Sequence, residues 1–549
     1  MQTWYADVHQ LTLELVRIPS LTNSAGETNF AQQLADLLTT WAYFQKYSSQ
    51  LRRLPTLNDL HQRENLFALV RGATAQTIVL AGHYDVVSIE NYGALQPWAY
   101  DPEALLPRLI AELEGSTQPA DAQALADLRS GNFMPGRGAL DMKSGLAAGL
   151  AVLRRAALQA RPLPCNLLFV ATPDEEQASH GMRSAVQQLP MLAAEWGLAL
   201  TAAINLDSGV DVGDGGQGQT IFMGSVGKLL PAVYVVGRET HAGAPFTGVN
   251  ATLLAAAITQ RIECNVALTD TVAGETSPPP VCLKQIDLKN YYDVTTPTAA
   301  WCYYNLLAHG RSASVTLDLF ATEVRAAMTE ALTTLQERAR QYSLQIGRSV
   351  TLPEMQPIFL TFAQLYEQAQ QRDATALAEV LAAGQREFAA DPAIDLPLYC
   401  SKIFAALWQC SGLTGPATVV GFASVHYPAA HVGDTTATER QLRQVIARQA
   451  SAVARDFATP VTLHPFFPGI SDMSFLGGNL SAEDAALVNA NTPVRSVQAG
   501  GAMPLTSLNL PTVNIGPWGR DYHRRTERVY MPYSFTVVPE LIWRIVNDW

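Results

Sequence analysis

Apolar residues form two different patterns in the first part of the chain. The segments 6–17 and 28–42 place apolar residues at helical spacing, whereas 77–81 and 166–172 are short, continuous apolar runs. Continuous runs of this length are typical of strands that are buried on both faces. The pattern therefore predicts an α/β fold in which helices flank both faces of a mixed sheet.

The pattern breaks twice further along the chain. Glycines interrupt it between Ser208 and Gly224, and a new strand-like run begins at Leu229. The segment 315–342 predicts a strand followed by a helix, and helical patterns resume around Phe362. These breaks predict a catalytic domain in two parts, 1–222 and 356–549, with a small α+β domain inserted at 223–355.

Length, charge and cysteine content narrow the class of protein. A chain of 549 residues exceeds what one hydrophobic core usually organises. A formal net charge of −12 without a basic cluster argues against nucleic acid as a partner. The first residues lack the pattern of a signal peptide, no run reaches the roughly 18 apolar residues of a membrane span, and the six cysteines form no CxxC pair. We therefore expect a cytoplasmic protein without a membrane partner.

A histidine and an aspartate follow the first predicted strand, and a second aspartate lies in a later glycine-rich loop. The run TIVLAG leads directly into His83 and Asp85, and residues two apart on an extended chain point to the same side. Asp85 is thus placed to orient the imidazole of a metal-binding His83. Asp141 lies in the glycine-rich loop GRGALDMKSG before a predicted helix. Taken alone, His83 and Asp85 are more typical of a polar pair at the mouth of a loop, and Asp141 is more typical of a helix N-cap.

Three adjacent carboxylates follow the next predicted strand. The run LLFVATP ends at Pro173 and is followed by Asp174, Glu175 and Glu176, which repel one another unless cations hold them. In a metal site, one of two neighbouring glutamates can bind an ion while the other takes a proton from water. A solvated acidic turn is the alternative.

A fourth strand-like run and a late glycine-rich loop complete an ordered set. AAINLDSG delivers Asp207 to a similar position, and GPWGRDYHRRTERVYMP places His523 in a loop with Glu527 four residues later. Considered singly, Asp207 and His523 have structural explanations, because an aspartate can cap a turn and a single histidine is usually structural. Together with the earlier residues they indicate a metal site.

This ordered set resembles the family-20 metallopeptidases, which include aminoacylase, acetylornithine deacetylase, succinyl-diaminopimelate desuccinylase, glutamate carboxypeptidase and peptidase T. The resemblance implies a zinc-exopeptidase-like fold in which His83 and Asp207 bind one metal ion. It implies that Asp141 bridges two ions and that Glu176 and His523 bind the second.

The same resemblance assigns Asp85 the role of orienting His83 and Glu175 the role of general base. Two histidines with carboxylates suit zinc, and manganese or cobalt is the alternative. The expected cofactors are therefore two divalent ions.

The inserted domain resembles the family's lid. GRETHAGAPFTGVNA matches a signature in which a histidine precedes a G-x-N-A helix start. The resemblance implies that His241 stabilises the oxyanion, often in the partner subunit's site, and that lids pair in a homodimer. A histidine in a strand-to-helix turn is the alternative for His241. By the same analogy, the candidate substrate contacts are Asn250, Ser471, Asp472 and Arg520.

The wording of HYDVVSIENYG and FFPGISDMSF, with the length of the chain, is most similar to the RocB-type branch associated with arginine utilisation. We expect hydrolysis of an amide bond in a small N-acyl amino acid or short peptide that carries a free carboxylate. Hydrolysis of another C–N bond in nitrogen salvage, or a non-catalytic metal-binding scaffold, are the alternatives. Extra segments near 95–135 and 362–468 have no predicted role.

Overall fold

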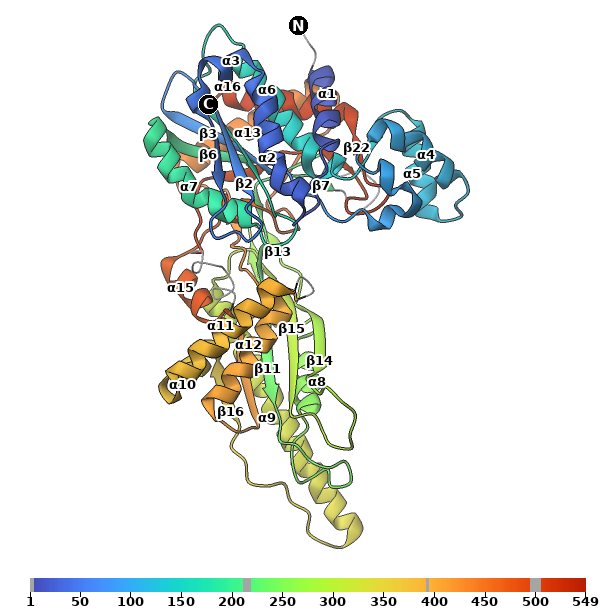
Figure 1. The fold of residues 1–549 in the computed structure, drawn as a ribbon, viewed down its shortest axis with the longest axis vertical. Coiled ribbons are helices and arrows are strands. Elements are labelled where there is room, and N and C mark those ends of the chain that lie inside the picture. The colour runs from blue at the N-terminus through green and yellow to red at the C-terminus, as the bar shows by residue number, and fades with distance from the viewer. Residues whose placement is uncertain (1–3, 211–218, 392–393, 494–504) are drawn as a thin grey trace. The chain divides into compact units, whose positions relative to one another are not determined.

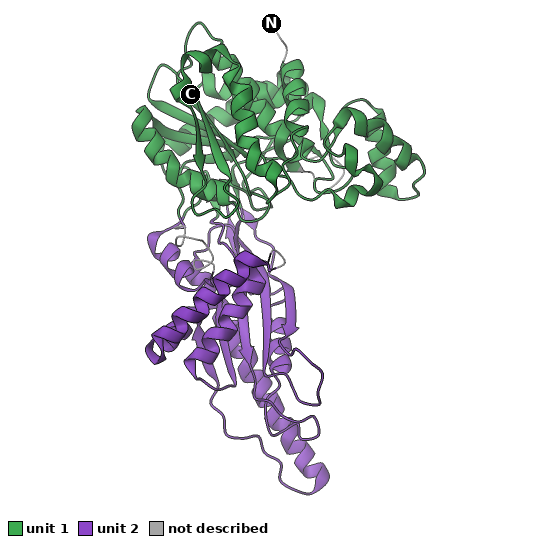
Figure 2. Cartoon of the chain, viewed as in Figure 1, with its two compact units in different colours: residues 1–225, 429–479, 506–549 green, residues 226–428, 480–505 purple. Residues whose placement is uncertain are grey.

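The computed structural model describes residues 4–210, 219–391, 394–493 and 505–549 (Figure 1). The chain forms two compact units (Figure 2). Unit 1 comprises Met1–Ser225, Ala429–Asn479 and Thr506–Trp549, and unit 2 comprises Val226–Pro428 and Leu480–Leu505. Each unit is built around a sheet of its own.

This division differs from the predicted boundaries at 222/223 and 355/356. The first boundary lies close to the glycine-rich break, but residues 356–428 remain in unit 2. The reason is strand pairing, because β17 (Ala417–Phe422) pairs antiparallel with β11 (Pro231–Val236) and β16 (Ile358–Thr361) pairs parallel with β17. The chain also returns to unit 2 at 480–505. The inserted unit is therefore larger than predicted.

An eight-stranded mixed sheet forms the centre of unit 1. Its order is β1 (Leu51–Pro55), β2 (Glu64–Val70), β5 (Asn166–Thr172), β3 (Gln76–His83), β6 (Ala199–Asn205), β20 (Thr512–Asn514), β8 (Thr220–Phe222) and β19 (Thr462–His464). The strands β5, β3, β6 and β20 run parallel to their neighbours within this set. Their carboxyl ends consequently meet at one edge, where open α/β sheets bind ligands.

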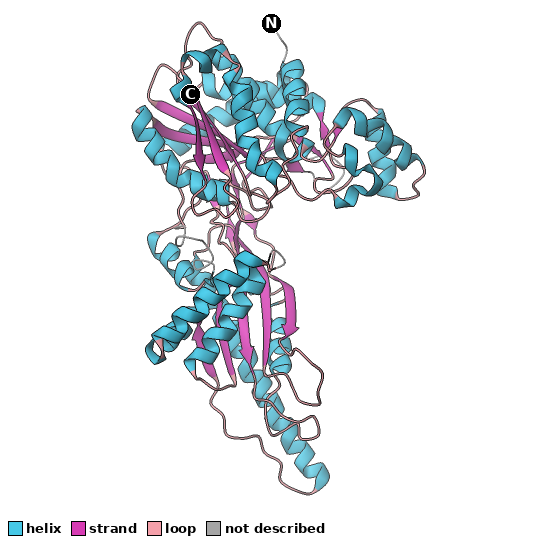
Figure 3. Ribbon diagram, viewed as in Figure 1, coloured by secondary structure: helices cyan, strands magenta, loops and turns pink. Residues whose placement is uncertain are grey.

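Helices cover both faces of this sheet, as Figure 3 shows. The main core cluster joins alternate residues of the strands to α1 (Trp4–Val16), α2 (Ala25–Thr39), α6 (Ser144–Ala157), α13 (Ala437–Asp456) and α16 (Val538–Asn547). On the other face, α7 (His180–Trp196) packs on β2 and β5, and α14 (Met473–Gly477) packs on β6 and β20. Burial on both sides explains the continuous apolar runs of β3 and β5.

A helical hairpin and a small sheet extend unit 1. The hairpin consists of α4 (Pro102–Glu114) and α5 (Pro119–Arg129), which lie side by side (Figure 1). The small sheet has the order β4 (Phe133–Pro135), β22 (Arg528–Tyr530), β21 (Trp518–Arg520) and β7 (Gly209–Val210). The shorter elements of unit 1 are α3 (Ala42–Lys46), β9 (Gly224–Ser225) and β18 (Ala430–His431).

Unit 2 has a six-stranded sheet with helices on both faces. Its path is β10 (Gly227–Leu229), β15 (Ala299–Ala308), β11, β17 and β16, with β14 (Val281–Asp287) also paired to β15. The β15 residue Tyr304 packs on Phe320 of α9 (Ala313–Ile346), whereas Trp301 packs on Phe404 of α12 (Leu396–Ser411). The remaining elements are α8 (Ala251–Ile262), α10 (Phe362–Arg372), α11 (Ala374–Ala390), α15 (Ala482–Ala490), β12 (Thr271–Val272) and β13 (Glu275–Thr276).

The strand predicted at the start of 315–342 is wrong, because α9 is one continuous helix. Its buried residues include Thr316, Leu317, Phe320 and Val324, which recur at three- and four-residue intervals. That spacing buries one helical face against unit 2's sheet and α8. Across the described residues, none of the helices combines the length and hydrophobicity that a bilayer crossing requires.

Candidate metal centre

The candidate residues gather where the central strands of unit 1 end. His83 is the last residue of β3, and Glu175 and Glu176 follow closely on β5. Asp207 follows β6, and Asp141 lies just before α6. Parallel neighbouring strands bring these segments to the same edge of the sheet. The predicted residues therefore lie together although they are far apart in sequence.

The first group of potential ligands consists of His83, Asp141 and Asp207. The Nε2 atom of His83 lies 3.2 Å from Oδ1 of Asp141 and 3.8 Å from Oδ1 of Asp207. This nitrogen is buried, and it has no hydrogen-bond partner within the described part of the chain. A buried imidazole nitrogen that faces carboxylate oxygens is the arrangement of a ligand set.

The second group consists of Asp141, Glu176 and His523. The Nε2 atom of His523 lies 3.0 Å from Oε2 of Glu176 and 3.3 Å from Oδ2 of Asp141. Asp141 thus belongs to both groups and turns a different carboxylate oxygen towards each histidine. This is the geometry of a bridging carboxylate.

The electrostatics of the cluster also fit cations. Burial raises the pKa of Glu175 well above its usual range, and the charges of Asp207 and Asp472 add to this rise. Burial together with the charge of Asp141 raises the pKa of Glu176 to about 7. Burial alone would lower the pKa of His523, but Asp141 and Glu176 outweigh it and raise that pKa to about 10. Carboxyl groups held this close favour a bound cation. The residues present therefore fit two divalent ions that share Asp141.

Asp85 connects the imidazole of His83 to the turn that carries the glutamates. Nδ1 of His83 lies 3.1 Å from the backbone carbonyl oxygen of Asp85 and 3.4 Å from its Oδ1 atom. The carboxylate of Asp85 accepts the backbone N–H of Glu175 at Oδ1, at 3.0 Å. Its Oδ2 atom accepts the N–H of Glu176 at 3.2 Å. This buried carboxylate can therefore orient His83 and fix the backbone of both glutamates at once.

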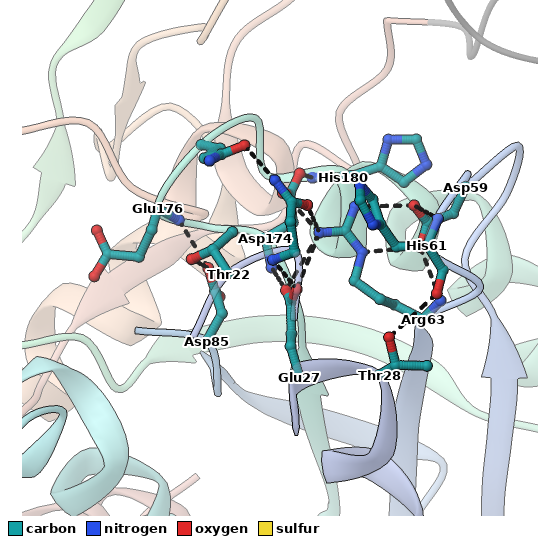
Figure 4. A network of polar contacts seen from close by, with 12 residues as sticks. Thr22, Glu27, Thr28, Asp59, His61, Arg63, Asp85, Asp174, Glu176 and His180 are labelled. Carbon is teal, nitrogen blue, oxygen red and sulfur yellow. Dashed lines mark hydrogen bonds and ion pairs between the residues drawn. The ribbon is translucent and has the colours of Figure 1, made fainter. Parts of the chain in front are cut away.

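Arg63 forms a second layer of support behind the same turn (Figure 4). Its guanidinium donates to Asp174 Oδ1 at 2.8 Å and to both carboxylate oxygens of Asp59 at 2.9 Å, and it lies 3.3 Å from Glu27. Glu27 Oε1 also accepts the backbone N–H of Asp174 at 2.9 Å. Figure 4 shows the side chain of Glu176 pointing away from this network. Asp174 is thus paired with Arg63 and is in neither ligand group, unlike Glu176.

A buried ion pair supports the other side of the centre. Glu527 Oε1 accepts the backbone N–H groups of Leu140 at 3.2 Å and Asp141 at 3.3 Å. Its Oε2 atom accepts from Arg137 Nη1 at 2.5 Å, and Arg137 Nη2 donates to the carbonyl of His523 at 3.3 Å. The pair therefore links the loop of Asp141 to the loop of His523.

Sequence reasoning missed Arg63, Glu27 and Arg137 and noted Glu527 only for its spacing. Arg63 stands just before the apolar run of β2, and Arg137 lies between two glycines of the loop before Asp141. Single arginines in such places are common. Their partners lie far away in sequence, so the sequence carries little signal for them.

The candidate substrate contacts are placed differently from the ligands. Ser471 and Asp472 are 1% and 2% exposed, and Asp472 Oδ2 accepts a hydrogen bond from Thr172. Arg520 lies 3.6 Å from Asp127 of the helical hairpin. Asn250 caps α8 by accepting the N–H of Thr252, and it lies in unit 2 with His241. Neither of these two belongs to the ligand groups of unit 1.

The fold and the shared aspartate are typical of a metal-dependent hydrolase, and comparison with known proteins gives the family. Residues 116–492 match the family described as peptidase family M20/M25/M40. The chain therefore belongs to this metallopeptidase family and is an enzyme. The predicted resemblance to family-20 metallopeptidases is confirmed.

Two curated relatives span nearly the whole chain. Protein RocB of Bacillus subtilis (strain 168) is 30% identical over 540 residues, which are 97% of this chain and 93% of RocB. The uncharacterized protein YqjN of the same organism is 32% identical over 542 residues, 97% of this chain and 94% of YqjN. These relatives confirm the likeness to the RocB-type branch.

Solved structures share the fold. The M20 family metallo-carboxypeptidase Sso-CP2 from Sulfolobus solfataricus has a TM-score of 0.52 at 11% identity, and 99% of each chain is covered. A tripeptidase from Staphylococcus aureus has a TM-score of 0.51 at 15% identity, covering 99% of this chain and 98% of that one. The predicted fold class, a helix-flanked mixed sheet, is thus confirmed.

Proposed function

We propose that this enzyme hydrolyses an amide bond of a small N-acyl amino acid or short peptide at a centre of two divalent ions. The observation that carries the proposal is Asp141, which turns one carboxylate oxygen to each of two ligand groups. Membership of a peptidase family supports the amide as the scissile bond. The two histidines among the ligands favour zinc, with manganese or cobalt as alternatives.

The ligand residues divide between two ions in this proposal. His83 and Asp207 hold one ion, Glu176 and His523 hold the other, and Asp141 contacts both. When bound, the ions supply Lewis acidity towards the scissile carbonyl and lower the pKa of the attacking water.

Glu175 is the general base of this proposal. Its Oε2 atom lies 3.9 Å from His83 Nε2, so the carboxylate borders the ligand set without belonging to either group. Asp85 fixes its backbone through the N–H group. A carboxylate held beside the ligands can take a proton from the attacking water and deliver it to the departing amine.

His241 is the proposed oxyanion-stabilising residue. Its Nδ1 atom accepts the backbone N–H of Gly243 at 3.0 Å, so the neutral ring carries its proton on Nε2. The side chain is exposed, which leaves this N–H free to donate to a developing oxyanion. In the same proposal, the protein is a homodimer formed through unit 2, and His241 of one subunit serves the active site of the other.

The substrate is tested by a screen. Metal-loaded protein is incubated with a panel of N-acyl amino acids and dipeptides, and mass spectrometry follows the released products. We expect release of a free amino acid from at least one class of small amide that carries a carboxylate. The panel also includes amino acids that carry a carbamoyl or amidino group. Turnover of these alone, with release of ammonia, would instead support hydrolysis of another C–N bond.

A further inference from the structure

The loop that carries His523 needs outside support for its backbone conformation. This segment, Asp521–Glu527, joins β21 to β22 and is called the His523 loop below. Asp521 and His523 have φ angles of 58° and 62°, in the left-handed region that side chains other than glycine rarely adopt. Such conformations persist where the surroundings determine them. The side chain of His523 is 41% exposed, whereas that of His83 is 1% exposed, so burial does not fix it.

The helical hairpin α4–α5 reaches this loop through carboxylates. The hairpin has an apolar contact surface in the core cluster, made by Leu105, Leu109, Leu113, Ala124 and Leu128. Asp121 Oδ2 accepts from Arg525 Nη2 at 2.7 Å, and Glu112 pairs with the same guanidinium. Arg525 is two residues from His523. One side of the loop is therefore tied to both helices of the hairpin.

Arg528 makes a second and more deeply buried tie. Its Nε and Nη2 atoms donate to Asp127 Oδ2 at 3.0 and 2.7 Å, and its Nη1 atom donates to Asp521 Oδ2 at 2.5 Å. The side chain is 2% exposed. The guanidinium thus lies between the hairpin and a loop residue whose φ is positive. Removal of one partner would leave a buried charge only partly compensated, so this tie constrains the loop more than exposed ion pairs do.

We propose that the hairpin α4–α5 is a positioning element for the second metal site. Asp121 and Asp127 act on Arg525 and Arg528, and the arginines hold the His523 loop in the conformation that brings His523 to Asp141 and Glu176. The proposal rests on the two-ion site proposed above. It gives the extra segment near 95–135 a role, because ion pairs connect the hairpin to the His523 loop.

The test is a metal titration of the Asp121→Asn/Asp127→Asn double variant by isothermal calorimetry and by elemental analysis after graded chelation. We expect one of the two ions to bind at least about tenfold more weakly, as for other residues that orient ligands, with the other ion unchanged. His523→Ala identifies which ion belongs to the second site. Arg525→Gln removes one ion pair of the loop and leaves the buried Arg528 intact. If the double variant does not fold, weaker binding of the second ion to Arg525→Gln tests the proposal.

The matched control is Glu114→Gln. Glu114 lies in the same hairpin and pairs with Arg129, and both side chains are about half exposed. The change removes the same charge, so we expect both ions to bind as in the wild type. If the Asp121→Asn/Asp127→Asn and Arg525→Gln variants fold and bind both ions as this control does, the role of the hairpin is overturned and the two-ion site still stands. Wild-type protein that binds fewer than two ions would overturn the two-ion site and, with it, this proposal.

Discussion

Asp141 is the residue on which both ligand groups depend. It faces His83 with one oxygen and His523 with the other. We expect Asp141→Ala to weaken both ions, whereas Asp207→Ala should weaken only the ion shared with His83. Metal content after equilibrium dialysis measures this difference. Loss of only one ion from Asp141→Ala would show that the carboxylate does not bridge.

His180 makes the stability of the protein depend on pH. Burial, with the nearby charge of Arg183, lowers its pKa from 6.5 to about 4. Between these values the unfolded chain binds more protons than the folded chain, so the free energy of unfolding decreases as the pH falls from about 6.5 to about 4. The full loss is up to about 3 kcal/mol. In denaturant titrations, the free energy of unfolding of the wild type minus that of His180→Asn should decrease by up to about 3 kcal/mol as the pH falls through this window, and a pH-independent difference would contradict this assignment.

Among single residues, the sequence predicted those of the candidate metal centre but not the buried residues that support them. His83, Glu176 and Asp207 follow apolar runs that mark strand ends, so their common edge followed from the order of strands. The buried partners Arg63 and Glu27 carry no such mark. Sequence likeness also predicts Asp472 as a substrate contact. The structure buries its side chain beside Thr172 and close enough to Glu175 for its charge to raise the pKa of that residue, and the substrate role stays a prediction.

The guanidinium of Arg63 supports the turn that follows β5. Arg63 pairs with Glu27, Asp59 and Asp174, and the side chains of all four are nearly buried. Arg63→Leu leaves buried carboxylates without their cation, so we expect a loss of about 3–5 kcal/mol in the free energy of unfolding. Equilibrium denaturation in urea measures it.

Arg52→Leu provides the matched control for this change. Arg52 pairs with Glu195, and both side chains are 40% or more exposed. Exposed pairs contribute about 0–1 kcal/mol, so we expect little change. Equal losses in the two variants would contradict a special role for Arg63.

Helices and strands were predictable where a segment carried a single clear hydrophobic pattern. The run 166–172 coincides with β5, and the run 77–81 lies within β3. The segment 315–342 failed because β-branched residues near its start favour a strand, whereas packing of one face against the sheet of unit 2 and α8 makes a single helix. Tertiary contacts outweighed local preference there.

At the scale of the whole molecule, the two-unit organisation was predictable but the second boundary was not. The pairing of β17 with β11 joins segments that are far apart in the chain, and no local pattern announces which strands will pair. The ordered motifs were a stronger guide, because they fixed the family across most of the chain. Division into a unit with the candidate metal centre and an inserted unit followed from them.

The proposed active site is a centre of two ions with Glu175 as its general base. The most direct measurement is the metal content of purified, metal-loaded wild type and Glu175→Gln, taken together with turnover of an amide substrate found in the screen. We predict about two ions per chain in both proteins and a loss of turnover of at least about 10²-fold in the variant. About one ion per chain or fewer in the wild type, or unchanged turnover in Glu175→Gln, would contradict it.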